Sequence, residues 1–355
     1  MSGTSLDGVD AVLADFSCRP PSVRASAHRP FPADLRAALF ALQVSGPDEI
    51  ERAAAAANAL AVCYAAAVEE VLQAAGATRE LILAIGCHGQ TIRHRPERGF
   101  TCQIGNAALL AERTGIRVVS DFRSRDVAAD GQGAPLAPAF HAEAFCDRAE
   151  RRAILNLGGI ANLTGLDIDG SVTGFDCGPG NCLMDLWCAR HTGARFDDSG
   201  KWAATGQVIP KLLQGLKREP YFAGPPPKST GRDLFNEAWL GARLEPAYEP
   251  RSVQATLLEL TAQTISDALE RFLPQTRRVI ACGGGTRNQT LMNRLRELLG
   301  AVTLEPSDAH GIDSQLVEPL AFAWLARQAI LGVSGNLPAV TGAAGPRVLG
   351  AVYPR

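Results

Sequence analysis

Residues 152–166 read RAILNLGGIANLTGL, and this stretch decides the fold. Apolar residues stand on both sides of Gly158 and Gly159, which predicts a strand, a tight turn and a second strand. Downstream, residues 171–191 predict a strand, a Gly-Pro-Gly loop and a helix. Residues 277–299 predict a strand, a triple-Gly loop and a helix. The second half of the chain is therefore predicted to be an α/β domain.

The first half opens in a related style, at GTSLDGVDAVLADF (residues 3–16). The alternation in residues 9–16 predicts a strand, and the Gly, Ser and Thr residues before it predict a turn. A turn of this kind should follow a strand, yet only Met1 and Ser2 precede it. We expect that strand to be a central member of the first domain's sheet, with the natural start a few residues upstream. Its loss would leave unpaired backbone and an open gap in the core.

The rest of the chain alternates predicted helices and strands. In the first half, helices are predicted at 34–43, about 48–75 and 104–115, and a strand is predicted at 116–122. Residues 81–91 form an apolar run that ends in a Gly-His-Gly turn, which predicts a buried strand followed by a loop on the active face. In the second half, further helices are predicted at about 203–217, 252–273 and 316–331. Residues 123–138 are rich in Gly, Pro and charge, which indicates the end of the first domain. We predict an N-terminal lobe of residues 1–125 with about 335–355, and a C-terminal lobe of residues 126–334.

The composition is that of a protein with a sizeable core, since 46% of the 355 residues are hydrophobic and 20% are charged. The net charge of −2 gives no attraction to nucleic acid or to an anionic membrane. The sequence has no run of about 18 uncharged apolar residues and no secretory signal pattern. Nine scattered cysteines without a C-x-x-C pair predict reduced thiols and a cytoplasmic location. Cys177, Cys182 and Cys188 cluster, but no His accompanies them at a suitable spacing, so no metal site is expected there.

Four Gly-bearing turns end predicted strands: GTSLDG (3–8), LGGIAN (157–162), DCGPGN (176–181) and CGGGTRN (282–288). Main-chain N–H groups beside Gly can approach phosphate oxygens closely. Each turn alone could equally be a tight hairpin, but four of them, spread over both halves, favour phosphate binding. None has the G-x-x-x-x-G-K-[ST] or G-x-G-x-x-G spacing. A nucleotide would therefore be held between two domains and not by one loop.

These paired turns and the late triple-Gly loop resemble the actin/hexokinase/sugar-kinase superfamily. That resemblance implies two related, ribonuclease H-like α/β domains with mixed sheets flanked by helices and a cleft between them. Longer motifs sharpen it over nearly the whole chain, in the order GTSLDGVD, CHGQTIRH, DFRSRDVAA, GQGAPLAPAFH, NLGGIANLT, GFDCGPGN, FDDSGKWAATG, PPKSTGRDLFN and CGGGTRN. With these motifs the chain resembles the anhydro-N-acetylmuramic acid kinase family.

The resemblance implies an ATP-dependent kinase that opens the 1,6-anhydro ring of anhydro-N-acetylmuramic acid with water and phosphorylates O6. The products are N-acetylmuramic acid 6-phosphate and ADP, and the pathway is peptidoglycan (cell-wall) recycling. The attacking water needs a carboxylate as general base. The leaving oxygen attacks phosphorus, so a separate acid is not required, and attack by water should invert C1. The resemblance gives the role of base to Asp176, which by position alone could also cap the following helix; Asp185, within that helix, is expected to be structural.

The resemblance also implies ATP and Mg²⁺ as cofactors. Asp7 is expected to orient Mg²⁺ through water, although it could instead be an Asx-turn residue. The residues expected to bind ATP are Gly3, Thr4, Ser5, Leu6, Asp7, Gly8, Val9, Asp10, Gly158, Gly159, Asn162, Gly178, Gly180, Gly283, Gly284, Gly285 and Asn288. The residues expected to bind the sugar are His88, Gln90, Arg125, Asp126 and Glu318. An Arg suits the lactyl carboxylate of a muramic acid through a bidentate contact.

Several alternatives stay open. His88 could be a structural residue, and Glu318 could simply favour the first turn of its helix. Lys228, Ser229 and Arg232 could touch the substrate or only fix a loop. Asp130 stands where the family has Gly, and Asp tolerates a positive φ better than most residues.

The function itself has two alternatives, an actin-like nucleotide-dependent switch and an inactive relative. The expected partners are the sugar and ATP, without nucleic acid or membrane, and a homodimer is an open alternative.

Overall fold

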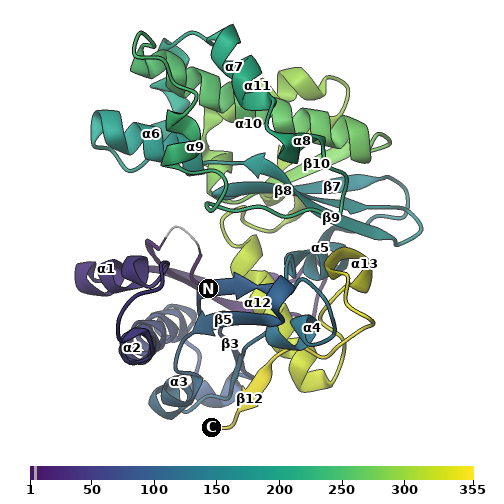
Figure 1. Ribbon diagram of the computed structural model, residues 1–355. Helices are drawn as coiled ribbons and strands as arrows, with labels where there is room; N and C mark the ends of the chain where they lie inside the picture. Colours follow the sequence, from purple (N-terminus) through teal and green to yellow (C-terminus); the bar gives the residue numbers. More distant parts are fainter. Residues whose placement is uncertain (4–5) are drawn as a thin grey trace. The chain divides into compact units, whose positions relative to one another are not determined.

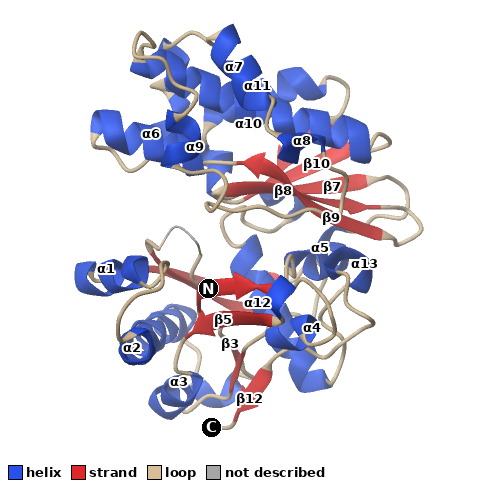
Figure 2. Ribbon diagram, viewed as in Figure 1, coloured by secondary structure: helices blue, strands red, loops and turns tan. Residues whose placement is uncertain are grey.

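The computed structural model describes residues 1–3 and 6–355, so Thr4 and Ser5 lie outside the described residues (Figure 1). The chain forms two compact units. Unit 1 is Met1–Ala144 with Leu316–Arg355, and unit 2 is Phe145–Gln315. Each unit contains a sheet with both parallel and antiparallel strands and flanking helices (Figure 2), which confirms the predicted α/β class with mixed sheets.

Unit 2 is built on one five-stranded sheet in the order β11-β10-β7-β8-β9. The strands β7 (Arg152–Leu157), β8 (Ile160–Leu166) and β9 (Val172–Pro179) form an antiparallel meander, so the strand–turn–strand prediction for 152–166 is confirmed. β10 (Arg278–Cys282) pairs in parallel with β7, and β11 (Thr303–Pro306) pairs in parallel with β10.

The helices of unit 2 surround a core that includes Phe175, Trp187 and Leu257. They are α6 (Cys182–Thr192), α7 (Pro210–Lys217), α8 (Pro220–Ala223), α9 (Glu237–Gly241), α10 (Pro250–Phe272) and α11 (Gln289–Leu299), with 3₁₀ turns η3 (Asp198–Gly200), η4 (Ala203–Thr205), η5 (Gly284–Arg287) and η6 (Ser307–His310). The predicted continuous helix over about 203–217 is wrong. Gly206 is extended after η4, and a new helix begins at Pro210, whose fixed φ suits a first helical position.

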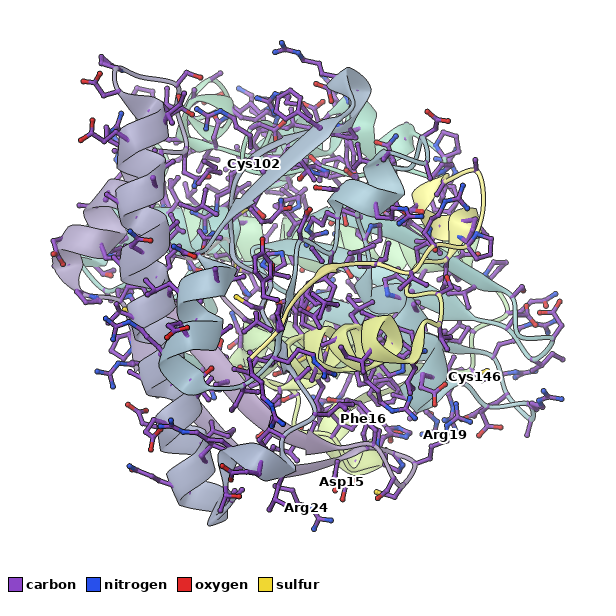
Figure 3. The ribbon with its side chains drawn as sticks, turned by 90° about the horizontal axis from the view of Figure 1, so that it is seen from below. Asp15, Phe16, Arg19, Arg24, Cys102 and Cys146 are labelled. Carbon is purple, nitrogen blue, oxygen red and sulfur yellow. The ribbon has the colours of Figure 1, made fainter. Side chains whose placement is uncertain are left out.

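Unit 1 has its strands in three separate sheets. The strands β1 (Gly8–Asp15) and β2 (Ser22–Pro30) form an antiparallel hairpin, with an ion pair of 2.7 Å between Arg24 and Asp15 near its turn (Figure 3). A second sheet has the order β12-β6-β3, from Ala351–Tyr353, Val118–Ser120 and Ile85–Gly86. The third is the hairpin of β4 (Gln90–Arg95) and β5 (Phe100–Ile104).

Two long helices dominate unit 1, α2 (Glu49–Ala75) and α12 (Val317–Leu331). The others are α1 (Ala33–Ala41), α3 (Ala107–Thr114), α4 (Ser124–Val127), α5 (Ala137–Phe145) and α13 (Pro338–Thr341), with 3₁₀ turns η1 (Arg79–Leu81) and η2 (Pro96–Arg98). Among the described residues, α2 is the single helix with the length and composition to cross a membrane, a test that the core helix of a soluble protein also passes. Leu60 and Ala67 of α2 are fully buried in the core of unit 1.

The units divide at other residues than the sequence predicts. Residues 126–144 and α12 belong to unit 1, whereas the prediction places them in the C-terminal lobe. The helix α12 packs against β1 and β3. The buried Asp126 carboxylate accepts hydrogen bonds from Asn336 and Thr341, more than 200 residues along the chain. Long-range burial, and not the Gly and Pro content of 123–138, decides where this unit ends.

A cavity of about 730 Å³ lies in unit 1, and its lining includes the whole of β1 from Val9 onward, β3, and Ala67 of α2. Met1 is part of this lining and pairs with Asp10: the Asp10 N–H donates to the Met1 carbonyl at 2.9 Å, and the Met1 amine donates to the Asp10 carbonyl at 2.7 Å. In a β-strand, the main-chain N–H and C=O groups of every second residue point to the same side. The groups of Val12 therefore point away from β2, as those of Asp10 do. The cavity thus lies beside strands that belong to separate sheets.

Candidate active site

Asp176 lies on β9, the edge strand of the sheet in unit 2, opposite Asn162 of β8 where the register shifts by a bulge. Its carboxylate Oδ2 accepts a hydrogen bond of 2.9 Å from the N–H of Thr230. Its main chain is held on both sides, since its N–H donates to the Lys228 carbonyl at 3.0 Å and its carbonyl accepts from the Tyr221 hydroxyl at 2.8 Å. The carboxylate is therefore fixed by a segment about 50 residues downstream.

The helix-capping alternative for Asp176 does not fit this geometry. The residue at the N-cap of α6 is Asn181, five positions further on, and the Asp176 carboxylate accepts from the N–H of Thr230. Asp185 lies in the first turn of α6, as expected for a residue within that helix.

The environment of Asp176 opposes its ionisation. Although part of the side chain is open to solvent, desolvation by the surrounding protein raises the pKa of Asp176 to about 7, against the opposing effects of the Thr230 N–H and of Lys228. A general base works best when its pKa lies close to the working pH. Near neutrality this carboxylate can both accept and release a proton.

The LGGIAN and DCGPGN turns of unit 2 bind each other directly. The N–H groups of Gly180 and Cys182 both donate to the Gly159 carbonyl, at 2.9 and 3.0 Å, and the Asn181 N–H donates to the Gly158 carbonyl at 2.9 Å. A Cβ on residue 180 would lie 2.4 Å from the Gly158 oxygen, so glycine is required there for this contact. The Gly180 N–H already has an acceptor, which weighs against its expected role as a phosphate donor.

Other expected ATP residues of unit 2 also have packing roles. A Cβ on Gly178 would lie 2.6 Å from the Phe222 ring, and one on Gly283 would lie 2.5 Å from the Asn156 side chain. Gly285 is buried against Leu157. Asn288 caps α11, because its Oδ1 accepts from the Leu291 N–H at 3.0 Å.

Some expected ATP residues of unit 2 remain accessible. Gly284 is exposed with open space around it, Gly158 is half-buried between β7 and β8, and Gly159 and Asn162 are likewise half-buried.

The N-terminal turn of unit 1 is held from several directions. The Gly3 carbonyl accepts from the Gln90 side chain at 3.2 Å, the buried Leu6 has φ 54°, and the Asp7 carbonyl accepts from the Phe31 N–H at 3.1 Å. A Cβ on Gly8 would lie 2.4 Å from the Arg29 carbonyl, so the β1–β2 pairing itself requires this glycine.

Two residues at the end of that turn have structural contacts. Val9 is buried in the core, and Asp10 pairs with His28 at 2.7 Å. The expected contributions of Thr4 and Ser5 lie outside the described residues.

The expected sugar residues separate into buried and exposed ones. His88 and Gln90 are buried, and Asp126 is completely buried with three hydrogen-bond donors, from Gly133, Asn336 and Thr341. Those contacts give Asp126 a structural role. Arg125 is exposed on α4, and Glu318 is exposed in the first turn of α12.

Arg123 is a candidate that the sequence analysis missed. Its guanidinium contacts the His88 Nε2 at 3.0 Å and donates to the Gly133 carbonyl at 2.8 Å. Burial and this guanidinium hold the pKa of His88 well below its ordinary range, so the imidazole is neutral near pH 7. The sequence does place Arg123 directly after the predicted 116–122 strand, and this position could have marked it as a candidate.

The structure also places the residues for which the sequence left alternatives open, Asp130 and those of the 228–232 segment. Asp130 has φ 63°, so this position does require a positive φ, which Asp adopts here. Lys228 contacts the carbonyls of Tyr221 and Phe222, whereas Ser229 and Arg232 are exposed. Among the described residues, no group of three or more His, Cys, Asp or Glu side chains is arranged to hold a metal ion.

Comparison with known proteins shows which family the chain belongs to. The sequence family described as "Anhydro-N-acetylmuramic acid kinase" matches residues 1–355. The chain belongs to this family. A relative of that name from Bordetella petrii is 56% identical over 360 residues, which cover 100% of this chain and 95% of its own. Another, from Nitrosomonas europaea, is 53% identical over 356 residues, covering 100% of this chain and 98% of its own.

The family membership confirms the resemblance found in the sequence, and with it a phosphotransferase of the kinase type. Among solved structures, the "Activator of the 2-Hydroxyisocaproyl-CoA Dehydratase from Clostridium difficile with bound ADPNP" matches 92% of this chain and 98% of its own. Its TM-score is 0.43 and its identity 14%, a likeness too low to carry an argument.

Proposed function

We propose that this kinase opens the 1,6-anhydro ring of anhydro-N-acetylmuramic acid and phosphorylates O6 with ATP, giving N-acetylmuramic acid 6-phosphate and ADP. The observation that carries the proposal is Asp176: a carboxylate fixed by the Thr230 N–H, with a pKa of about 7, in a chain of this family. The names of the relatives support the substrate.

The chemistry runs in one balanced sequence. Water attacks C1, and Asp176 takes its proton. The bond between C1 and O6 breaks, and the released O6 attacks the γ-phosphorus of ATP, so that the bond from that phosphorus to the β–γ bridging oxygen breaks and ADP leaves. The phosphoryl group takes the place that an acid occupies in a glycosidase, and the proton held by Asp176 passes to solvent. Because water attacks opposite the leaving oxygen, C1 is inverted.

Each unit has its own proposed binding residues. In unit 2, ATP binding falls to the accessible main chain of Gly158, Gly159 and Gly284 and to Asn162, while Gly178, Gly180, Gly283, Gly285 and Asn288 give these loops their shape. In unit 1 it falls to the turn from Gly3 to Asp7. There, Glu318, Arg125 and the Arg123–His88 pair are proposed to bind the sugar, with Gln90 supporting the turn.

Mg²⁺ fits the donors of unit 1. With a nucleotide, Mg²⁺ keeps several waters and takes one or two carboxylates besides phosphate oxygens, so the half-buried Asp7 is a sufficient protein partner. Bound Mg²⁺ would neutralise charge on the transferred phosphoryl group.

The proposed setting is cytoplasmic recycling of peptidoglycan sugars, which follows from the substrate. The test is incubation of the protein with ATP, Mg²⁺ and the anhydro sugar, with ³¹P NMR to detect a sugar 6-phosphate. We expect ADP and the 6-phosphate in equal amounts, and neither when the anhydro sugar is omitted. Release of free phosphate without a sugar phosphate would favour a nucleotide-dependent switch, and no reaction at all would favour an inactive relative.

A further inference from the structure

The segment that fixes Asp176 carries a positive charge that the proposed reaction does not use. Residues 220–230 run from α8 along the edge strand β9, where the Lys228 carbonyl accepts from the Asp176 N–H and the Tyr221 hydroxyl donates to the Asp176 carbonyl. Phe222 and Tyr221 pack on Phe235, at centroid distances of 5.6 and 5.9 Å, which ties the segment to the core of unit 2.

The ammonium of Lys228 is held in a defined place. It donates to the carbonyls of Tyr221 and Phe222 at 3.3 and 3.4 Å, and lies 4.8 Å from the Tyr221 ring centroid and 5.5 Å from that of Phe272. Carbonyl oxygens and aromatic faces are partners for a cation. A flexible side chain is thus fixed over the same tyrosine whose hydroxyl binds Asp176.

Few charged or titratable groups act on Asp176. Lys228 and Tyr221 come from the segment 220–230, Cys177 is the neighbour on β9, and burial keeps the pKa of Cys177 above its ordinary value, so this thiol is neutral. From α10, Arg271 acts on Lys228 and donates to the Ala223 carbonyl at 2.9 Å. Lys228 is therefore the cation of unit 2 whose charge favours the ionised Asp176, and its main chain adjoins Asp176 through the hydrogen bond of 3.0 Å.

We propose that Lys228 is a positioning residue that holds Asp176 in its ionised form, a role that rests on the proposed function of Asp176 as general base. A nearby cation favours the carboxylate over the carboxylic acid. Burial favours the protonated acid, and a protonated Asp176 cannot accept the proton of water. Lys228 thereby sets the pH above which the base works.

The competing interpretation is that Lys228 only caps α8. Two cations bind the carbonyls at the end of that helix, Lys228 at Tyr221 and Phe222 and Arg271 at Ala223. Arg271 supplies the same kind of cap without acting on Asp176. The variant Arg271→Gln is therefore a matched control, because it removes one capping cation and leaves the other.

The decisive measurement is the titration of the Asp176 carboxyl by ¹³C NMR in the full chain, identified by its loss in Asp176→Asn. We expect Lys228→Gln, which keeps a donor for the carbonyls, to raise the pKa of Asp176 by about one unit. Lys228→Arg should restore the wild-type titration, and Arg271→Gln should leave it unchanged. If Lys228→Gln does not fold, Lys228→Met gives the same comparison, with melting temperature reported for each variant.

Turnover gives the second readout. The acid limb of the kcat profile should move to higher pH in Lys228→Gln, with about a fivefold loss at pH 7 and recovery to within about twofold at pH 9. An unchanged Asp176 titration in Lys228→Gln, or an equal shift in Arg271→Gln, would overturn the proposal. If the titration shifts but the wild type opens no anhydro sugar, the role of Lys228 stands and the proposed function fails.

Discussion

The sheets of the two units differ in continuity, although both halves of the sequence open with a strand beside a Gly turn. In unit 2 the LGGIAN turn lies between the paired strands β7 and β8, and five strands form one sheet. In unit 1 the turn precedes β1, and the strands are split into separate sheets beside a cavity of about 730 Å³. A Gly turn is shaped by the strands that enter and leave it as much as by its own residues.

The difference extends to the candidate residues. Asp176 is fixed by contacts that all lie within unit 2, to Thr230, Lys228 and Tyr221. The N-terminal turn of unit 1 is held by side chains of other elements, since Gln90 donates to the Gly3 carbonyl and Arg36 donates to the Leu6 carbonyl. The proposed general base is thus held by a segment that packs along the edge of the continuous sheet, and stability should be limited by the interrupted sheets of unit 1.

The largest effect is expected from Asp176→Asn, which tests the proposed role of this unit 2 residue as general base. The amide keeps an acceptor for the Thr230 N–H but cannot take a proton, so we expect kcat to fall by about 10²–10⁴-fold with the fold intact. Steady-state kinetics with the anhydro sugar and circular dichroism would check both parts. Turnover within about twofold of wild type would remove Asp176 from the mechanism.

On the side of unit 1, Asp126→Ala should lower the free energy of unfolding by about 3 kcal/mol. The substitution leaves the buried donors of Gly133, Asn336 and Thr341 without their acceptor. Urea unfolding measures the loss, and Asp130→Asn is the control, since residue 130 is exposed and Asn also tolerates φ 63°. Equal stability of the two variants would contradict the structural role of Asp126.

Filling the cavity beside β1 tests whether the separate sheets of unit 1 limit the stability of the protein. A short apolar strand fused ahead of Met1 can pair with β1 and bury its side chains, so we expect stability to rise by about 2 kcal/mol, or several °C in melting temperature. A Gly/Ser extension of equal length is the control, because it offers main chain without apolar side chains. If both extensions leave the melting temperature unchanged, the cavity does not take up a further strand beside β1.

The smallest expected effect is a pH-dependent gain from the same Asp176→Asn variant. The pKa of Asp176 is about 7 in the folded chain against 3.8 ordinarily, so ionisation opposes folding. Wild-type stability should therefore fall as pH rises from about 4 to 7 and level off above. The variant should be more stable than wild type by about 1–2 kcal/mol at pH 8 and no more stable at pH 4. A gain that is the same at both pH values would contradict the raised pKa.

Much of unit 2 could be predicted from the sequence, because its signals are local. The strands β7, β8 and β9, the three Gly loops and the place of Asp176 in the second half of β9 all follow from periodicity and turn residues within a short window. The hydrogen bonds of Tyr221, Lys228 and Thr230 to Asp176 could not be predicted. Those residues lie about 50 positions away from Asp176 in the sequence and carry no repeating pattern.

Unit 1 was harder for the same reason. The short β12 pairs with β6 from over 200 residues away, and α12 joins the unit by packing on β1 and β3. The strand predicted at the start of 81–91 is shorter than expected, since only Ile85–Gly86 pairs with β6, and the loop predicted after it leads into β4. Arg123 and the buried state of Asp126 also depend on contacts that local patterns do not contain.

In the proposed mechanism, water opens the sugar ring while phosphate is transferred, with Asp176 as the base. Turnover in ¹⁸O-labelled water, followed by mass spectrometry over a few minutes, tests it most directly. Unlabelled product incubated in the same water corrects for exchange at the anomeric position. We expect one ¹⁸O atom at C1 and none in the phosphoryl group. Product without ¹⁸O at C1, or with label in the phosphoryl group, would contradict the mechanism.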